Sequence, residues 1–296
     1  MGGERDSIRD DARRGQDAAR ATRVWGVLNV TPDSFSDGGQ FVDVQAATRR
    51  ALEMRSEGAS VIDVGGASSR PPGATYGAGA SEVSVAEEID RVVPVIEAIT
   101  VAGMDVSVDT TRAEVAQAAL DAGASIVNDV SGGACGLLLE LVAARGVQLV
   151  LMHTRDGGRV DAQTTDYPDL VGDVLRETES MAERAVAHGV DRDQLWIDPG
   201  IGFAKTAAQN AQLLGNLDAF VETGYPVLVG ASRKSFIARL GAALPDGELA
   251  PPSRRLGGSL AAVSAAAWAR CAAVRVHDVF ESAQAVSVTL AMRGRA

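Results

Sequence analysis

The chain has 296 residues, of which 46% are hydrophobic and only 4% aromatic, and its net charge is −11. A chain of this length buries a large core, either in one α/β barrel or in two smaller domains, and a core poor in aromatic side chains suits parallel sheets covered by helices. The negative charge excludes a general binder of nucleic acids or membrane surfaces, because phosphate groups require clustered Lys and Arg, although a small anionic substrate stays compatible with locally concentrated positive groups.

The first segment, residues 1–23, is charged and lacks the apolar stretch of a secretory signal. We therefore expect a disordered N-terminal extension followed by one folded domain over residues 24–296. The longest apolar stretch, residues 260–269, is too short to cross a bilayer. The two cysteines, Cys135 and Cys271, are isolated and predict reduced thiols rather than a bridge. Together these features predict a cytoplasmic protein.

Short runs rich in Val, Ile or Leu predict eight buried strands along the chain. They span residues 24–30, 60–65, 105–109, 125–130, 148–153, 195–198, 227–230 and 274–277. Helical periodicity separates them, for example over residues 85–100, 113–122 and 174–188. Gly58, Gly123 and Gly189 stand where helices give way to the next strand, as expected of glycine C-caps.

Eight strands, each followed by a helix, are typical of a (β/α)8 TIM barrel, an α/β fold of about 250 residues in a single domain. A doubly wound open sheet is the structural alternative, but no Gly-x-Gly-x-x-Gly follows the first strand. Residues 67–84 and 241–253 form two long, glycine-containing loops, and long loops inside compact domains are usually functional or disordered.

Polar or ionisable residues stand at the C-terminal ends of all the expected strands, and in a barrel these ends converge on one mouth. In chain order they are Asn29; Asp63; Asp109; Asn128 and Asp129; His153, after Met152; Asp198; Ser232, Arg233 and Lys234; and Arg275 and His277. For a single residue such as Thr110, Asp129 or Asp278, helix capping is an equally good interpretation. A complete set of polar strand ends favours a binding site.

The chemistry of these residues divides into two sets. Buried carboxylate and amide groups suit a flat heterocycle with adjacent N–H donors, such as a 2-amino-4-oxo pyrimidine edge, and these are Asp109, Asn128 and Asp198. Cationic groups and one amide suit phosphate or pyrophosphate, and these are Arg70, Lys234, Arg275, His277 and Asn29. Asn29 also offers an oxygen ligand for Mg²⁺, which typically takes one or two protein ligands besides substrate phosphates. A salt bridge to a loop carboxylate is the alternative for Arg70 or Arg275.

Several motifs carry a family resemblance that extends from about residue 24 to the C-terminus. They are NVTPDSFSDGG (29–39), DVGGASSRPPG (63–73), SVDT (107–110), NDVSGG (128–133), DPGIGFAKT (198–206), GASRKSFI (230–237), GGSLA (257–261) and RVHDV (275–279). In this order they resemble the motifs of the dihydropteroate synthases of folate biosynthesis. The first is highly specific.

The resemblance implies a homodimeric transferase that joins p-aminobenzoate to 6-hydroxymethyl-7,8-dihydropterin pyrophosphate with the help of Mg²⁺. By matching motifs, the pterin would contact Asp109, Asn128, Met152, Asp198, Lys234 and Arg275. The pyrophosphate would contact Asn29, Arg70, Arg275 and His277, with the metal on Asn29. The p-aminobenzoate pocket would be bordered by Ser69, Pro71, Phe203, Ser232 and Lys234.

The mechanism implied by the family is substitution through a resonance-stabilised pterin methylene cation. Asp109 would offer negative charge near that cation, with Lys234 and Arg275 as further catalytic residues. The arylamine is already neutral at pH 7 and needs no strong base, which agrees with the lack of an evident acid/base pair in the sequence. The loops after Asn29 and Gly66 would cover the site.

One loop departs from the family pattern. Ala67 stands where family members usually have Glu, and Pro71 is followed by a second proline in a lengthened loop up to Ser81. These departures predict an altered site for p-aminobenzoate and for the sulfonamides that mimic it. They leave open a non-catalytic pterin-binding homologue. A methyltetrahydrofolate-binding methyltransferase domain is a further alternative, although it would not need the Ser-Arg-Pro and Ser-Arg-Lys motifs.

Overall fold

Eight parallel strands form a barrel in the computed structural model, which describes residues 22–30, 43–67, 83–241 and 248–294. The strands are β1 (Arg23–Asn29), β2 (Val61–Gly65), β3 (Asp105–Asp109), β4 (Ile126–Asp129), β5 (Gln148–Met152), β6 (Leu195–Asp198), β7 (Leu228–Val229) and β8 (Ala273–Val276). They pair in the order β6-β5-β4-β3-β2-β1-β8-β7. A bridge between Ile197 and Val227 brings β6 next to β7 and nearly closes the ring. The predicted (β/α)8 barrel is confirmed.

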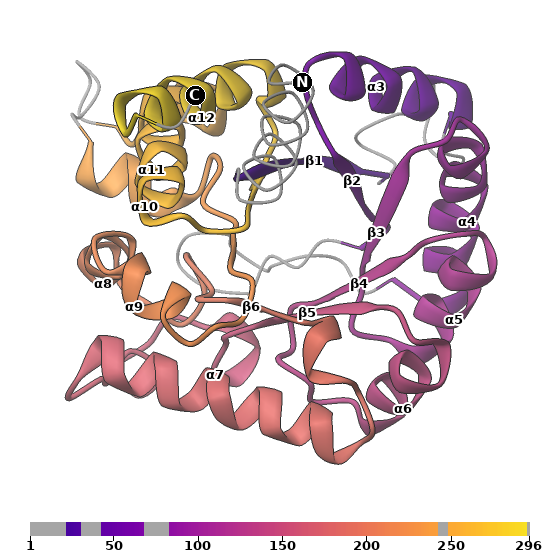
Figure 1. The fold of residues 1–296 in the computed structure, drawn as a ribbon, viewed down its shortest axis with the longest axis horizontal. Coiled ribbons are helices and arrows are strands. Elements are labelled where there is room, and N and C mark those ends of the chain that lie inside the picture. Colours follow the sequence, from indigo (N-terminus) through magenta and orange to yellow (C-terminus); the bar gives the residue numbers. More distant parts are fainter. Residues whose placement is uncertain (1–21, 31–42, 68–82, 242–247, 295–296) are drawn as a thin grey trace, which may run out of the picture.

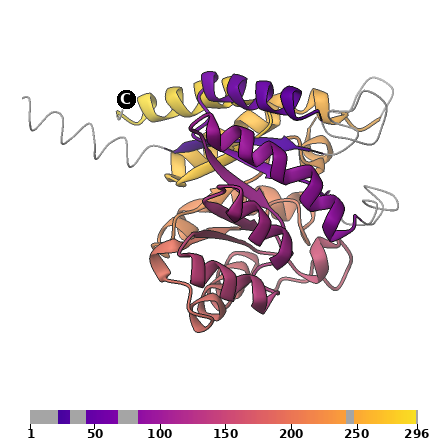
Figure 2. The ribbon, with the colours of Figure 1, turned by 90° about the vertical axis from the view of Figure 1, so that its right-hand side faces the viewer.

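Helices surround the strands in chain order (Figure 1). They are α3 (Val44–Ser56), α4 (Val85–Val101), α5 (Ala113–Asp121), α6 (Gly136–Arg145), α7 (Leu170–Ala187), α8 (Ala207–Leu214), α9 (Leu217–Val221), α10 (Ser235–Leu240), α11 (Leu256–Ala269) and α12 (Val279–Met292). Short 3₁₀ turns occur at Asp156–Gly158, Arg192–Gln194 and Pro252–Arg254. The first and last described helices, α3 and α12, lie side by side in both views (Figures 1 and 2).

Two apolar clusters stabilise the barrel. The larger one fills the space between the strands and the helices. The smaller one fills the barrel interior, and it consists of Trp25, Val61, Ile126, Val150, Trp196, Leu228 and Ala273. The rings of Trp25 and Trp196 lie 5.4 Å apart between centroids. Because side chains alternate along a strand, inward positions beyond this layer point into the barrel mouth.

The strand register places polar residues side by side at that mouth. Asn29 on β1 is level with Gly65 on β2, and Gly65 is level with Asp109 on β3. Asp109 is in turn level with Asn128 on β4. On the other side of the barrel, Asp198 on β6 is level with Met152 on β5. The fold therefore gathers residues that are widely separated in the sequence.

Local signals explain where the elements begin and end. Ser84 and Glu87 form a capping box at the start of α4. Asp169 caps α7 by accepting a hydrogen bond from the Gly172 amide, so this helix begins earlier than the expected residue 174. The backbone φ angles are +110° at Gly58, +104° at Gly123 and +94° at Gly189, which confirms the glycines expected after α3, α5 and α7. Observed strand limits lie within one residue of the expected ones, and those of β3 and β6 match them.

Both cysteines are free in the structure, and Cys271 is buried in the core while Cys135 precedes α6. Across the described ranges, the helices are too short or too polar to span a membrane. The proposed loop cover at residues 31–39 and the loop residues Ser69, Arg70 and Pro71 lie outside the described residues.

Candidate functional site

Arg275 lies between two carboxylates at the barrel mouth. Its Nε donates to Asp63 Oδ2 at 2.5 Å, and its Nη2 donates to Asp109 Oδ2 at 2.6 Å. The Asp63 side chain is 0% exposed and those of Asp109 and Arg275 are 11% and 19% exposed. The sequence analysis placed Asp109 and Arg275 in separate chemical sets, and the structure joins the two residues in one ion-paired cluster. The partners of Arg275 are strand residues rather than the loop carboxylate considered as an alternative.

The three-residue cluster has one cation for two carboxylates, and the pKa values of Asp109 and Arg275 are shifted there. Burial raises the pKa of Asp109 to about 7, with Arg275 opposing the shift and Asp63 adding to it. Burial alone would lower the pKa of Arg275, but Asp63 and Asp109 outweigh that effect and raise it above its usual value. Asp109 is therefore poised to change its charge near neutral pH.

Asn29 and Asp109 face each other across Gly65. A Cβ atom on Gly65 would lie 3.7 Å from Asn29 Oδ1 and 3.8 Å from Asp109 Oδ2, so any larger side chain would enter the space between them. Asn29 is exposed at the end of β1, and Asn128 is buried at the end of β4. Among the described residues no three His, Cys, Asp or Glu side chains gather as a metal site. The single hard oxygen of Asn29 still fits Mg²⁺, which needs few protein ligands when a substrate supplies phosphate oxygens.

Asp198 and Lys234 form a second charged group on the opposite side of the mouth. Asp198 is buried, and its Oδ1 accepts a hydrogen bond of 2.7 Å from the Gly200 amide. Burial raises the pKa of Asp198, and the positive charge of Lys234 opposes that shift. Burial lowers the pKa of Lys234 to about 8, with Asp198 opposing it. The Lys234 ammonium donates to the Ile201 carbonyl and lies 4.5 Å from the centroid of the Phe203 ring.

Ser232 and His277 meet beside this group. The Ser232 hydroxyl accepts a hydrogen bond of 3.2 Å from the His277 amide, and it lies 3.0 Å from His277 Nδ1. Burial lowers the pKa of His277 to about 4, and the nearby Arg275 contributes in the same direction. The sequence grouped His277 with the cations, whereas in this environment the imidazole is neutral at pH 7. Its chemistry is that of a hydrogen-bonding group.

For Thr110, Asp129 and Asp278, the sequence left helix capping as an equally good interpretation. In the structure the side chains of these residues have other partners. Thr110 donates to Glu88 at 2.8 Å, and Asp129 accepts from the amides of Ser131 and Gly133. Asp278 occupies the N-cap position of α12 without a capping hydrogen bond. Its carboxylate instead forms an ion pair with Arg233, whose Nε donates to it at 3.0 Å.

Two arginines hold the described ends of the loop that departs from the family pattern. Arg91 donates to the Gly66 carbonyl at 2.9 Å, just before the loop, and Arg112 donates to the Val83 carbonyl at 2.7 Å, just after it. Arg112 also donates to the buried carboxylate of Glu88 at 3.0 Å. The loop is thus anchored at both ends to the helical layer.

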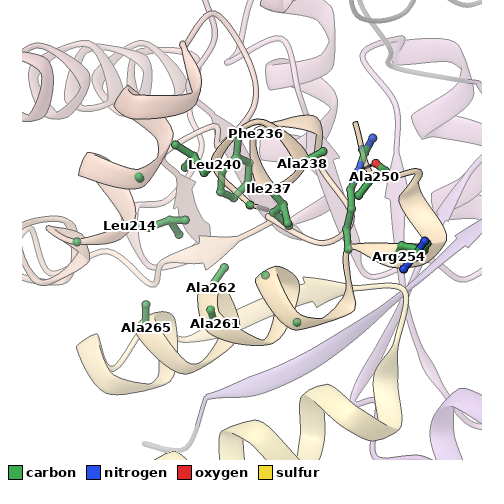
Figure 3. A pocket seen from close by; sticks show the side chains of 16 residues that line it. Leu214, Phe236, Ile237, Ala238, Leu240, Ala250, Arg254, Ala261, Ala262 and Ala265 are labelled. Atoms are coloured by element: carbon green, nitrogen blue, oxygen red, sulfur yellow. Dashed lines mark hydrogen bonds between the residues drawn. The ribbon is translucent and has the colours of Figure 1, made fainter. Parts of the chain in front are cut away.

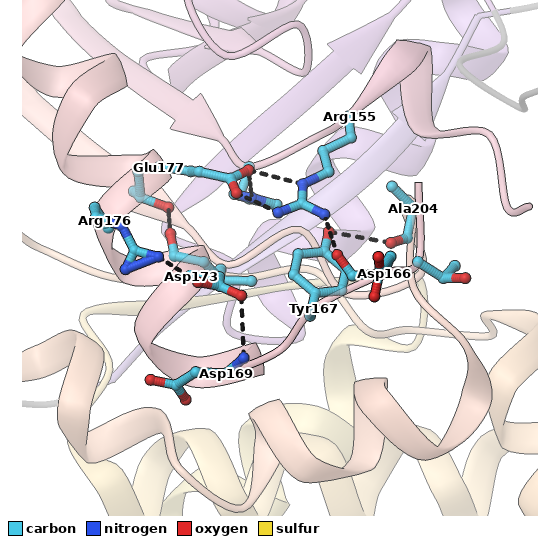
Figure 4. A network of polar contacts seen from close by, with 12 residues as sticks. Arg155, Asp166, Tyr167, Asp169, Asp173, Arg176, Glu177 and Ala204 are labelled. Atoms are coloured by element: carbon cyan, nitrogen blue, oxygen red, sulfur yellow. Dashed lines mark hydrogen bonds and ion pairs between the residues drawn. The ribbon is translucent and has the colours of Figure 1, made fainter. Parts of the chain in front are cut away.

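A polar network joins helix α7 to the segment that carries Phe203, and Glu177, Arg155, Tyr167 and Ala204 belong to it (Figure 4). It includes His153, Lys205 and Glu177, none of which was among the site residues predicted from the sequence. Asp63 was noted at a strand end but was likewise not assigned to the site. Inward alternation on β2 could have identified Asp63. The motif over residues 198–206 contains Lys205 but does not indicate that its side chain is buried.

An apolar cavity of about 550 Å³ lies outside the barrel, among α8, α10 and α11 (Figure 3). Leu214, Phe236, Ile237 and Ala262 are among the residues that line it. None of the predicted site residues belongs to this lining. The charged groups at the strand ends, which can orient and activate a polar ligand, make the mouth the better candidate for the active site.

The sequence profile of the pterin binding enzyme family matches residues 25–277, which include all the strand ends described above. The chain belongs to the pterin-binding enzyme family. A dihydropteroate synthase from Mycobacterium leprae is 46% identical, and the match covers 90% of this chain and 92% of that protein. A probable bifunctional folylpolyglutamate synthase/dihydropteroate synthase from Haloferax volcanii is 43% identical over 97% of this chain, which spans only 34% of that longer protein.

Solved structures agree with this assignment. Xanthomonas albilineans dihydropteroate synthase with 4-aminobenzoic acid matches with a TM-score of 0.81 and 41% identity, covering 92% of this chain and 93% of that one. Yersinia pestis dihydropteroate synthase in a sulfonamide drug complex matches with a TM-score of 0.82 and 40% identity, covering 93% and 95%. The resemblance to dihydropteroate synthases is confirmed, and this pterin-binding enzyme is a transferase.

Proposed function

We propose that this pterin-binding enzyme condenses 6-hydroxymethyl-7,8-dihydropterin pyrophosphate with p-aminobenzoate to give 7,8-dihydropteroate and pyrophosphate. The observation that carries the proposal is the pairing of buried acidic groups with cations around one mouth, with Asp198 and Lys234 on one side and Asp109 and Arg275 on the other. Buried carboxylates require donors, and a pterin ring presents adjacent N–H groups that satisfy them.

The pterin is held through its polar edge. Asp198 Oδ2 is the oxygen that the Gly200 amide leaves unused, so it is the better placed acceptor for pterin N–H donors. The Asn128 amide supplies both a donor and an acceptor from β4. Met152, buried at the end of β5, offers an apolar surface to the ring. Asp109, Lys234 and Arg275 complete the contacts with the ring.

The pyrophosphate leaves toward Asn29, Arg275 and His277, with Arg70 assigned to the same group by its motif. Asn29 is the residue that would hold Mg²⁺, since its amide oxygen is a hard ligand at the exposed end of β1. When bound, the metal supplies positive charge for the departing oxygens. Arg275 contributes a permanent cation, and neutral His277 contributes a hydrogen bond.

The reaction breaks the bond between the pterin methylene carbon and the pyrophosphate oxygen before the arylamine attacks. The bonding electrons leave with pyrophosphate, and the methylene cation is stabilised by resonance and by the Asp109 carboxylate. The arylamine nitrogen then forms the C–N bond and releases its proton to solvent. Phe203, Ser232 and Lys234 border the arylamine pocket, and Ser69 and Pro71 are assigned to the same pocket by their motif alone. Fixed charges and positioning supply the rate acceleration.

A steady-state assay of dihydropteroate formation, with and without Mg²⁺, tests this proposal. Purified protein should form product in a metal-dependent manner, and Lys234→Ala should lose most of the activity. Pterin binding without product would support the non-catalytic homologue instead, an alternative disfavoured by relatives that are named synthases. Full activity of Lys234→Ala would contradict the assigned role of that residue.

A homodimer and a cytoplasmic location complete the proposal. Several large apolar side chains are about half exposed on neighbouring late helices, and these are Leu240, Trp268, Phe280, Val288 and Met292. Such a surface is typical of a protein interface. Sedimentation at several protein concentrations measures the oligomeric state, and cell fractionation measures the location.

A further inference from the structure

The segment that carries Phe203, residues 199–206 between β6 and α8, is fixed through its backbone. It lies so close to β5 that a Cβ atom on Gly200 would be 1.9 Å from the His153 carbonyl oxygen, and the φ angle of Gly200 is +69°. Only glycine fits this approach. Further along, the Gly202 amide donates to Asn210 Oδ1 at 2.6 Å, and the Ala204 amide donates to the Gly158 carbonyl at 3.1 Å.

Lys205 is hydrogen-bonded to the backbone of this segment. Its side chain is buried, and its ammonium donates to the carbonyls of Gly200 at 3.2 Å and Phe203 at 3.0 Å. The third donor goes to His153 Nδ1 at 2.9 Å. Burial lowers the pKa of Lys205 to about 7, and in its protonated form the ammonium uses all three of its donors here. Burying a charged group is costly, and the hydrogen bonds of the Lys205 ammonium all go to the loop and to His153.

His153 connects Lys205 to helix α7 through hydrogen bonds. Because its Nδ1 accepts from Lys205, its Nε2 carries the proton and donates to Glu177 Oε2 at 3.0 Å. Burial lowers the pKa of His153 to about 4, in agreement with a neutral ring. Glu177 also accepts from Arg155 Nε at 2.9 Å.

The network then returns to the same loop (Figure 4). The Arg155 guanidinium lies 3.8 Å from the centroid of the Tyr167 ring. The Tyr167 hydroxyl donates to the Ala204 carbonyl at 3.2 Å. The loop is therefore held at Gly200 and Phe203 by Lys205, and at Ala204 by Tyr167.

Two groups of this loop contact Lys234, a residue that the proposed function assigns to both substrates. The Ile201 carbonyl accepts a hydrogen bond from Lys234, whose ammonium also lies against the Phe203 ring. A Cβ atom on Gly158 would be 2.4 Å from Phe203 Cδ1, so Gly158 also lies close to this ring. The ring is close to both Gly158 and Lys234, so a shift of the loop would displace both Phe203 and the Ile201 carbonyl that accepts from Lys234.

We propose that Lys205 is a positioning residue that fixes Phe203 and Lys234 for the arylamine substrate through its hydrogen bonds to the loop and to His153. This inference rests on the proposed synthase function. It predicts that the loop attachment sets the affinity for p-aminobenzoate more than the affinity for the pterin. The pterin shares Asp198 and Lys234 with this loop but also contacts Asp109, Asn128 and Met152 on other strands, whereas Phe203 belongs to the loop itself.

The variant Lys205→Met removes the three donors while keeping an unbranched side chain. We expect the KM for p-aminobenzoate to rise about tenfold or more, and the KM for the pterin pyrophosphate to change by less than about threefold. Glu179→Gln, an exposed residue on α7, is the matched control and should leave both constants unchanged. An unchanged KM for p-aminobenzoate, or an equal rise in both constants, would overturn the proposal.

A second variant and a second readout separate the possible failures. If Lys205→Met does not fold, Glu177→Gln decides the matter, because it weakens the contact to His153 from outside the loop and should raise the same KM by about two- to fivefold. Amide hydrogen exchange of residues 200–204 reports the loop attachment without turnover and should become faster in both variants. An inactive wild-type enzyme would refute the proposed function and the substrate part of this inference, whereas unchanged exchange would refute the positioning role itself.

Discussion

Arg275 donates a hydrogen bond of 2.6 Å to Asp109, a carboxylate that shares this cation with the fully buried Asp63. One guanidinium therefore serves two acidic groups whose own strands are adjacent. In the proposed reaction, as the pyrophosphate leaves the pterin, it would interact with Arg275 and weaken the ion pair between Arg275 and Asp109. The Asp109 carboxylate would then be free to stabilise the pterin cation. The ion pair thus links leaving-group stabilisation to cation stabilisation.

Asp109→Asn should reduce kcat while leaving the fold intact. The variant removes the negative charge near the methylene cation, and we expect a loss of about 10²–10³ in kcat, as for removal of one electrostatic stabiliser. The folded-state pKa of Asp109 is raised from 3.8 to about 7, so its contribution to stability is full below pH 3.8 and is lost as pH rises toward 7. At pH 8 the variant should therefore melt at the same or a higher temperature. A clear fall in melting temperature would show that Asp109 is mainly structural.

The pH profile of kcat/KM should fall on both sides of a narrow optimum. Asp109 must be ionised, so activity falls as pH drops below about 7, and Lys234 must be protonated, so activity falls as pH rises above about 8. Lys234→Arg keeps its charge at all these pH values. In that variant the alkaline limb should move upward by at least one pH unit while the acid limb stays in place. An unmoved alkaline limb would assign it to another group.

The strands and the barrel were predictable because each strand is a short apolar run that ends in a polar residue. The pairing of Asp63 with Arg275 was not predictable, since they are 212 positions apart in the sequence and only closure of the barrel brings β8 beside β1, one strand away from β2. Similarly, Lys205 belongs to the motif over residues 198–206, but the motif does not show that its side chain is buried. Burial also decides the charge of His277, which sequence alone treats as an ordinary imidazole.

Glu88→Gln should loosen the anchored loop that follows β2. Glu88 is buried in α4 and accepts hydrogen bonds from Thr110 and from Arg112, which also holds the Val83 carbonyl. We expect a destabilisation of about 1–3 kcal/mol in denaturant unfolding, because the amide cannot satisfy the guanidinium as the carboxylate does. The KM for p-aminobenzoate should rise several-fold as well. Asp90→Asn, on the exposed side of the same helix, is the control, and equal effects of the two variants would contradict the anchoring role.

Ala67→Glu restores the residue that the family usually has at the start of this loop. Ala67 directly follows Gly66, whose carbonyl is held by Arg91, so the new carboxylate would be introduced at an anchored position. Because p-aminobenzoate and sulfonamides share one pocket in the proposed function, the KM for the substrate and the inhibition constant of a sulfonamide should shift in the same direction. Pterin binding should stay unchanged, since Asn128 and Asp198 belong to β4 and β6. Identical KM and inhibition values for the two proteins would show that Ala67 does not alter the arylamine site.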